Sequence, residues 1–452
     1  PPSPGEQFVA WRWARTVRCP NPACGADTFL LQSMWISKKK GNLAWFEPVT
    51  DGETRGLRVV SGQLKGAAPD SPKVGRGANF QCLYCGNAVS EDWLIKEGTA
   101  GRISDKLVCV VTERAGTRHY RSPTAEEIHA ADVDYPDDFP SVPLPDIPRW
   151  FSGPRFGFAT QRDLYAPRQI AVLDAFATSI ADTFDRIQAD GGSHEWATAA
   201  TTLLGLGLGK LAQSNSRQVR WNRPEMPKAE PAFGQNDMPM LWDYVETNPF
   251  GSSVGSFRGI IIDQLRALRY VAPGEGRALR RDAREATAEL PTLIATDPPY
   301  FDAIGYADLS DYFYLWHRRA LRNVHPDLYM TVAAPKKGEL TAIPAHHGNS
   351  PTDAKQYFID GFTKTFNALM NAQDPDLPLL VVYASKEQKA GSGEETRWAS
   401  ILTAMIAANL EITGTWPIHG ATVARLIGNQ ANSIASYIVM VCRPRSASAT
   451  AR

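Results

Sequence analysis

Four of the six cysteines form two close pairs whose spacing suits a metal ion. The first pair lies in Cys19-Pro-Asn-Pro-Ala-Cys24-Gly and the second in Cys82-Leu-Tyr-Cys85-Gly. Short cysteine loops that end in glycine let two thiolates converge on one tetrahedral ion, and two such knuckles make a four-cysteine zinc ribbon. Disulfides are the alternative, which a reducing cytosol disfavours. Because four thiolates leave no open coordination position, we expect a structural Zn²⁺ site at Cys19, Cys24, Cys82 and Cys85.

A second constellation, Asp297-Pro298-Pro299-Tyr300, follows the apolar stretch Leu293–Thr296. Ligands of an open α/β sheet bind beyond the carboxyl ends of its strands, where this tetrapeptide would lie. The two prolines fix φ and remove two N–H groups, so no donor competes for the Pro298 carbonyl. With the Asp297 carboxylate it offers two acceptors for an exocyclic amine, whose lone pair is thereby directed toward an electrophile such as a methyl sulfonium. Tyr300 offers a face on which an extruded base can stack.

Several of these features also admit simpler interpretations. A Pro-Pro turn can merely close a strand. Cys109 and Cys442 lie in apolar, β-like runs and are most simply buried core residues. The stretch Gly205-Leu-Gly-Leu-Gly209 lies in a helical run with no preceding strand, so we interpret its glycines as close helix packing rather than as a cofactor loop.

A basic segment offers a candidate contact with nucleic acid. No acidic residue occurs between positions 195 and 225, where Arg217, Arg220 and Arg223 surround Trp221. These residue types suit phosphates and base edges, so we predict a loop that contacts DNA. Lys38–Lys40, between the cysteine pairs, add further positive charge. The alternative for each is an ordinary solvated basic face.

Periodicity indicates which elements position these residues. Apolar residues at 3/4 spacing predict a helix over Pro167–Ala189, and a second helix covers Glu195–Ser214. From about Ser256, helices alternate with strands, which argues for a doubly wound α/β sheet that ends in an antiparallel hairpin. The later predicted helices are Phe257–Val271, Asp308–Asn323, Lys355–Met370 and Thr396–Asn409. The predicted strands are Leu43–Phe46, Leu57–Val60, Ala278–Arg281, Pro291–Thr296, Leu377–Ala384, Glu411–Trp416 and Ile434–Cys442.

Composition narrows the class of protein. Of 452 residues, 43% are hydrophobic and 21% charged, which excludes a disordered chain and a disulfide-stapled miniprotein. Lys plus Arg and Asp plus Glu both number 48, so any nucleic-acid binding must be local. The longest apolar runs fall far short of the ~20 residues of a membrane helix. With no signal segment at the start, we expect a cytoplasmic protein without membrane contact.

The order of these features predicts four parts. Residues 1–115 would form the zinc-ribbon domain and residues 116–150 an acidic, proline-rich surface linker. Residues 151–255 would form a helical segment with the DNA-contact loop, and residues 256–452 the catalytic domain.

The motifs together resemble one family. Asp-Pro-Pro-Tyr after an apolar strand is similar to motif IV of amino-methyltransferases. The stretch Asp297–Arg319, with Lys38-Lys-Lys-Gly41 and Thr415-Trp-Pro-Ile-His419, resembles the bacterial adenine-specific DNA methylases that contain a zinc ribbon and are often found in phage-defence clusters. The resemblance runs from Trp13 to Arg443. It implies a Rossmann-like α/β methyltransferase sheet, S-adenosylmethionine as cofactor and adenine N6 of DNA as substrate.

The resemblance also implies roles for particular residues. Asp297 would contact the cofactor, as would Asp282 and Ala283, which look like motif III; a solvated charge in a basic run is the alternative for Asp282. Phe301 would contact the substrate. The family's glycine-rich cofactor motif is absent and lies N-terminal to the ribbon in the family.

We therefore expect this chain to be the C-terminal part of the enzyme. A preceding segment or a separate chain would supply the first strands of the sheet and most cofactor contacts, with other defence-system subunits as further partners. The residues themselves are also compatible with two other functions. One is methylation of cytosine N4 or of RNA, and the other is a zinc-ribbon DNA-binding subunit without activity of its own.

Overall fold

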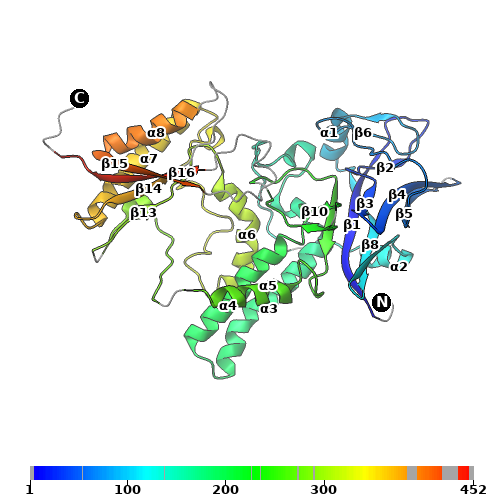
Figure 1. Ribbon diagram of the computed structural model, residues 1–452, viewed down its shortest axis with the longest axis horizontal. Helices are drawn as coiled ribbons and strands as arrows, with labels where there is room; N and C mark the ends of the chain where they lie inside the picture. The colour runs from blue at the N-terminus through cyan, green and yellow to red at the C-terminus, as the bar shows by residue number, and fades with distance from the viewer. Residues whose placement is uncertain are drawn as a thin grey trace. The chain divides into compact units, whose positions relative to one another are not determined.

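The computed structural model describes residues 5–52, 54–136, 138–224, 226–234, 236–271, 274–288, 291–383, 394–419 and 436–446. The chain divides into two compact units. Unit 1 comprises Pro1–Gly274 and Asp308–Ala334, and unit 2 comprises Glu275–Ala307 and Pro335–Arg452. Both units contain helices and strands (Figure 1), so the chain is a mixed α/β protein, which confirms the broad class of the predicted doubly wound α/β fold.

The main sheet of unit 1 is antiparallel and is built around β1 (Glu6–Arg18). Its strand order is β12-β1-β8-β9, and β2 also pairs with β1. Apolar residues on both faces of β1 are buried, as expected of a central strand. The other strands are β2 (Asp27–Phe29), β8 (Ser104–Arg114), β9 (Thr117–Arg121) and β12 (Asp243–Thr247).

A smaller sheet fills the long segment between the cysteine pairs. The strands β3, β4 and β5 form an antiparallel meander, and β4 and β5 contain both strands predicted there. Two short hairpins and the helix α1 complete this part of unit 1. The bounds are β3 (Trp35–Lys39), β4 (Asn42–Asp51), β5 (Thr54–Ser61), β6 (Phe80–Gln81), β7 (Ala88–Val89), β10 (Arg220–Asn222), β11 (Lys228–Glu230) and α1 (Glu91–Thr99).

Four longer helices of unit 1 begin and end close to the predicted residues. The helix α3 has the predicted bounds, because Pro167 pre-sets the first turn and apolar residues recur along one buried face. An added Cβ at Gly205 of α4 would lie 2.6 Å from Leu321 of α6, so the glycine stretch serves close helix packing as predicted. The bounds are α3 (Pro167–Ala189), α4 (His194–Ala212), α5 (Phe257–Leu268) and α6 (Tyr306–Leu321), whose first two residues belong to unit 2.

Strand pairing in unit 1 crosses the predicted domain boundaries at two points. Strand β9 lies in the predicted linker but completes the main sheet, and strand β12 lies in the predicted helical segment but pairs with β1. The predicted linker also contains α2 (Ala125–Ala130), and its side chains Phe139, Val142 and Trp150 are buried. Proline spacing suggested an exposed linker, yet the apolar residues between the prolines are packed into unit 1.

Unit 2 is a mixed sheet with the order β13-β14-β16-β15. Strands β13 and β14 are parallel, whereas β16 is antiparallel to both β14 and β15, which confirms the predicted terminal hairpin. The helices α7 and α8 pack on one face of the sheet (Figure 1), where Phe358, Phe362 and Phe366 of α7 join a buried core. The bounds are β13 (Ala295–Thr296), β14 (Leu379–Tyr383), β15 (Leu410–His419), β16 (Ser436–Pro444), α7 (Pro351–Ala372) and α8 (Glu394–Ala407).

Two predicted strands of unit 2 differ in the structure. The strand predicted at Ala278–Arg281 is not formed: these four exposed residues, two of them arginines, belong to none of the strands that the structure describes. The strand predicted at Pro291–Thr296 is regular only at β13, although the Ile294 carbonyl still accepts a hydrogen bond from Leu380 N (3.0 Å). Ala384, Ile434 and Ala435 of other predicted strands lie outside the described residues.

Candidate metal centre and candidate base-binding site

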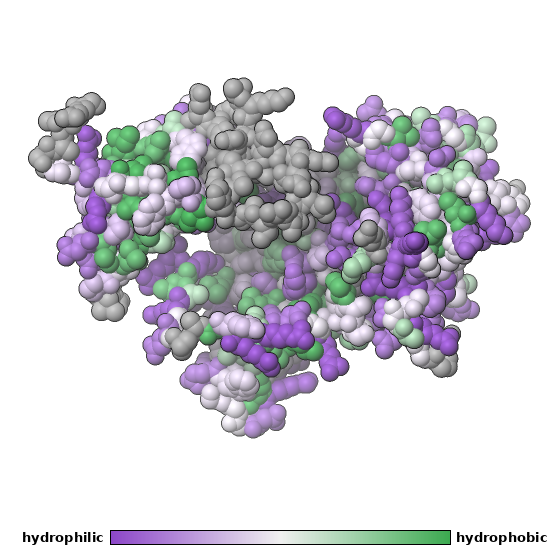
Figure 2. Space-filling model, in the orientation of Figure 1, coloured by the Kyte–Doolittle hydropathy of each residue, from purple (hydrophilic) through white to green (hydrophobic). Residues whose placement is uncertain are grey.

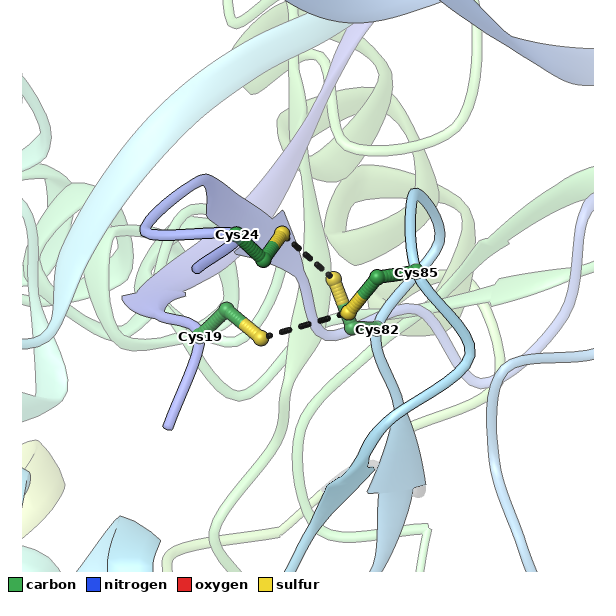
Figure 3. A group of neighbouring side chains, drawn as sticks. All are labelled: Cys19, Cys24, Cys82 and Cys85. Atoms are coloured by element: carbon green, nitrogen blue, oxygen red, sulfur yellow. Dashed lines mark hydrogen bonds between the residues drawn. The ribbon is translucent and has the colours of Figure 1, made fainter. Parts of the chain in front are cut away.

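The four predicted cysteines converge in unit 1 (Figure 3). Sγ of Cys19 lies 3.7 Å from Sγ of Cys85, and Sγ of Cys24 lies 3.9 Å from Sγ of Cys82. All four sulfurs lie within 4.8 Å of one another. A tetrahedral zinc ion with Zn–S bonds of about 2.3 Å requires sulfurs about 3.8 Å apart. These cysteines are free, and together they form a cluster, called the cysteine cluster below, that can hold a metal ion such as zinc.

Glycine turns shape both knuckles of the cysteine cluster. The N–H groups of Cys24 and Gly25 both donate to the Asn21 carbonyl, and Gly86 N donates to the Cys82 carbonyl. Gly25 and Gly86 adopt φ of +55° and +72°, a left-handed conformation that favours glycine. The glycine after each cysteine pair is therefore required by the left-handed turn that closes the knuckle, in agreement with the sequence analysis.

The thiols of the cysteine cluster differ in acidity. Burial raises the pKa of Cys19 to about 12, whereas the backbone N–H of Ala26 lowers the pKa of Cys24 to about 7. Metals bind thiolates, so loading the cluster at neutral pH displaces at least the Cys19 proton.

The Asp-Pro-Pro-Tyr tetrapeptide lies at the carboxyl end of β13, as predicted. The Asp297 side chain is exposed, and its Oδ1 accepts a hydrogen bond of 2.6 Å from the Tyr300 hydroxyl. Burial and this hydrogen bond to a carboxylate both raise the pKa of Tyr300, so its proton is retained. The Tyr300 ring meets Tyr383 edge-on, with 5.4 Å between centroids. The carboxylate is thus held in one orientation, with Oδ2 left for another donor.

The backbone after Asp297 turns tightly. The Pro299 carbonyl accepts from Phe301 N (3.1 Å) and the Tyr300 carbonyl from Ala303 N (2.9 Å). By contrast, no residue that the structure describes is seen to donate to the Pro298 carbonyl. Phe301 has a φ of +56°, which is uncommon for a residue with a side chain and often marks functional segments.

The predicted substrate contact at Phe301 is not supported. Its ring packs on Phe358 with 5.1 Å between centroids, and its carbonyl accepts from Ala342 N (3.0 Å). The strained backbone turns this side chain into the core of unit 2, so Phe301 holds the tetrapeptide in place.

Asp282 and Ala283, the predicted cofactor contacts, lie in the short 3-10 helix Ala283–Glu285. Asp282 caps this helix and forms a two-pronged ion pair with Arg284, with distances of 2.9 and 2.5 Å. Both carboxylate oxygens are therefore engaged within unit 2. A role of Asp282 and Ala283 in cofactor binding stays a prediction.

The structure places two residues of the predicted DNA-contact loop, Arg217 and Trp221, away from the surface. Trp221 is 7% exposed in β10, and its Nε1 donates to the Ile36 carbonyl (2.7 Å). Arg217 is held in the interior by Asp105 (2.7 Å) and donates to the Tyr135 hydroxyl (3.2 Å). Both side chains therefore stabilise the fold of unit 1. The polar composition of the segment had suggested an exposed loop instead.

Arg220 and Arg223 are partly exposed. They lie beside other basic residues that are distant in the sequence, a grouping that the sequence analysis did not predict. The Arg223 carbonyl accepts from Lys38 N (2.8 Å), so the segment lies beside the β3–β4 hairpin. Lys38, Lys39 and Lys40 of this hairpin are exposed. Hydrophilic side chains cover much of the visible surface over β1 to β5 (Figure 2). We call Lys38–Lys40, Arg220 and Arg223 the basic patch.

The interior of unit 1 holds an ionic cluster with no sequence signature. Asp105 accepts from Arg15 (3.2 Å), Arg217 (2.7 Å) and the Tyr244 hydroxyl (3.0 Å). Burial raises the pKa of Asp105, but the guanidinium groups of Arg217 and Arg15 outweigh it and bring the pKa to about 2. The pair of Arg168 and Glu246 (2.6 Å) adjoins this cluster.

Among the described helices, none combines the length and hydropathy needed to cross a membrane. No protein-family model, curated protein or solved structure matches the chain.

Proposed function

We propose that this chain is the catalytic part of an S-adenosylmethionine-dependent methyltransferase that acts on adenine N6 in DNA. The observation that carries the proposal is the exposed Asp297 carboxylate at the carboxyl end of a strand in a parallel pair, next to the Pro298 carbonyl. Open α/β sheets bind ligands at this edge. The sequence resemblance to DNA adenine methylases supports the same substrate.

The chemistry assigned to this chain's residues is positioning. Asp297 Oδ2 and the Pro298 carbonyl would accept the two hydrogens of an exocyclic amine, while Tyr300 holds Oδ1. Two acceptors on one amine draw its lone pair out of the ring and aim it for in-line attack. The cofactor, when bound, supplies the methyl group as a sulfonium.

The sheet of unit 2 supports the need for a further segment or chain. Strand β13 ends the four-stranded order, so its outer edge pairs with no strand that the structure describes. The proposal assigns the glycine-rich cofactor turn to strands added at this edge, from another segment of the protein or a partner chain. Other defence-system subunits remain proposed partners on the resemblance alone.

Unit 1 would bind DNA and be stabilised by zinc. The cysteine cluster has the sulfur spacing of a tetrathiolate zinc site, with no position open for catalysis. The basic patch supplies exposed cations for phosphates, which give affinity without sequence readout.

A second candidate function is a DNA-binding subunit that has no activity of its own. The outer edge of β13, which no described strand covers, and the ion-paired Asp282 favour it, because the described residues offer few contacts for a cofactor. It differs from the first in predicting DNA binding without methyl transfer in every combination with partner chains.

The test uses the full chain purified with the chains that accompany it. It is incubated with S-adenosylmethionine labelled in the methyl group and with DNA or RNA, and the labelled nucleoside is identified after digestion. The proposal predicts N6-methyladenine from DNA. If the label appears in N4-methylcytosine or in RNA, the chain is a methyltransferase with a different substrate. If the chain binds DNA but transfers no label, the second candidate, a DNA-binding subunit without activity, is favoured.

A further inference from the structure

Arg55 reaches the cysteine cluster from a strand that lies far from every ligand in sequence. It belongs to β5, in the segment of 57 residues between the two cysteine pairs. Its Nη1 lies 3.0 Å from Sγ of Cys24 and 3.1 Å from the Cys24 carbonyl. One guanidinium nitrogen therefore donates to both the side chain and the backbone of the same ligand.

The second knuckle fixes the position of Arg55. Tyr84 lies between Cys82 and Cys85, and its ring centroid is 5.6 Å from the Arg55 guanidinium carbon. The Tyr84 hydroxyl donates to the carbonyl of Gly56, the residue after Arg55 (3.1 Å). Arg55 thus contacts the first knuckle through Cys24 and the second through Tyr84, and β5 closes over both.

Charge explains why a cation suits this position. Four thiolates around a divalent ion carry a net charge of −2, and Cys19 and Cys82 are buried. A guanidinium offsets part of this charge, and hydrogen bonds to charged groups are stronger than neutral ones. Groups that hydrogen-bond to metal ligands orient them and change metal affinity.

We propose that Arg55 is a positioning residue of the metal centre, which orients the Cys24 thiolate and partly neutralises the zinc tetrathiolate. This inference rests on the proposed zinc site. It gives the long segment between the knuckles a function, since β5 delivers the cation that the short knuckles lack.

The experiment measures metal affinity of the full chain by competition with a chromophoric chelator, and the visible spectrum of the Co²⁺-loaded protein. The variants are Arg55→Ala and Arg55→Lys, with Arg58→Ala as control. Arg58 lies on the same strand but pairs with Glu47 on the surface (2.8 Å). Circular dichroism of the zinc-loaded variants verifies that each is folded.

The proposal predicts that Arg55→Ala weakens zinc binding by about 10- to 100-fold. It also predicts that the sulfur-to-cobalt charge-transfer band moves to lower energy, since a thiolate that has lost its N–H donor gives up charge more readily. Arg55→Lys should restore part of both effects, and Arg58→Ala should change neither. If the unaltered chain binds zinc but Arg55→Ala leaves affinity and spectrum unchanged, the role of Arg55 is wrong and the zinc site stands. If the unaltered chain binds no zinc, both proposals fail.

Discussion

Nη2 of Arg217 lies 2.7 Å from Oδ2 of Asp105 in unit 1, and the two side chains are only 15% and 9% exposed. The ordinary pKa of an aspartate, 3.8, falls to about 2 at Asp105 in the folded chain. A carboxyl with a lowered folded pKa contributes stability that is present above its unfolded pKa and lost as the pH falls through its folded pKa. The contribution of Asp105, about 2 kcal/mol, should therefore be complete above about pH 4 and mostly lost by about pH 2.

The variant Asp105→Asn tests this relationship. It leaves the buried Arg15 and the largely buried Arg217 without their counter-charge, so we expect it to lower the free energy of unfolding by about 3–5 kcal/mol at pH 7. Urea unfolding at pH 5 and pH 3 should show the gap between the two proteins narrowing by about 1 kcal/mol. A gap of equal size at both pH values would show that Asp105 does not titrate as the structure requires.

Gly205→Ala tests the packing of α4 against α6. The new methyl group would lie 2.6 Å from three atoms of Leu321, which is itself fully buried. The gain in helix propensity, about 1 kcal/mol, offsets only part of the overpacking, so we expect a net loss of about 1–2 kcal/mol. Leu206→Ala is the neighbouring control, since Leu206 is 47% exposed and should change stability by less than about 1 kcal/mol. Thermal unfolding that ranks the two variants in the opposite order would refute the close packing.

Cys82→Ser tests the metal centre without any assay of activity. Metal analysis of the purified chain should give one zinc per chain, and the variant should hold much less because one of four ligands is gone. Cys109→Ala is the control, because Cys109 is buried in β8 and belongs to no metal cluster found among the described residues. Equal zinc content in both variants would contradict the assignment.

Arg220→Ala combined with Arg223→Ala tests the basic patch. Loss of two phosphate contacts should weaken DNA binding and reduce the slope of log affinity against log salt by about 2. Arg266→Ala with Arg269→Ala removes two exposed cations from the region of α5 and should leave binding unchanged. Binding that is equally weak in both double variants would point to net charge rather than to the patch.

Local sequence signals predicted the helix bounds and the metal ligands well. The contacts between side chains that lie far apart in the sequence could not be predicted. The bounds of α3 follow from Pro167 and a regular apolar stripe, and the cysteine cluster follows from short loops that end in glycine. Arg217 was misassigned because its partner Asp105 lies on a distant strand, and a solvated and a buried arginine look alike in sequence. Arg55 was missed for the same reason. The contact of Lys38 with Arg223 likewise depends on how two remote segments pair.

The proposed chemistry depends on Asp297, and the rate of methyl transfer from labelled S-adenosylmethionine to adenine in DNA tests it most directly. The measurement compares the unaltered chain, purified with its accompanying chains, with Asp297→Ala and with the control Asp360→Ala, an exposed aspartate on α7. Loss of a preorganised acceptor should lower the rate by about 100-fold or more in Asp297→Ala, with DNA binding retained and Asp360→Ala unaffected. Methyl transfer by Asp297→Ala at the rate of the unaltered chain would contradict the proposed function.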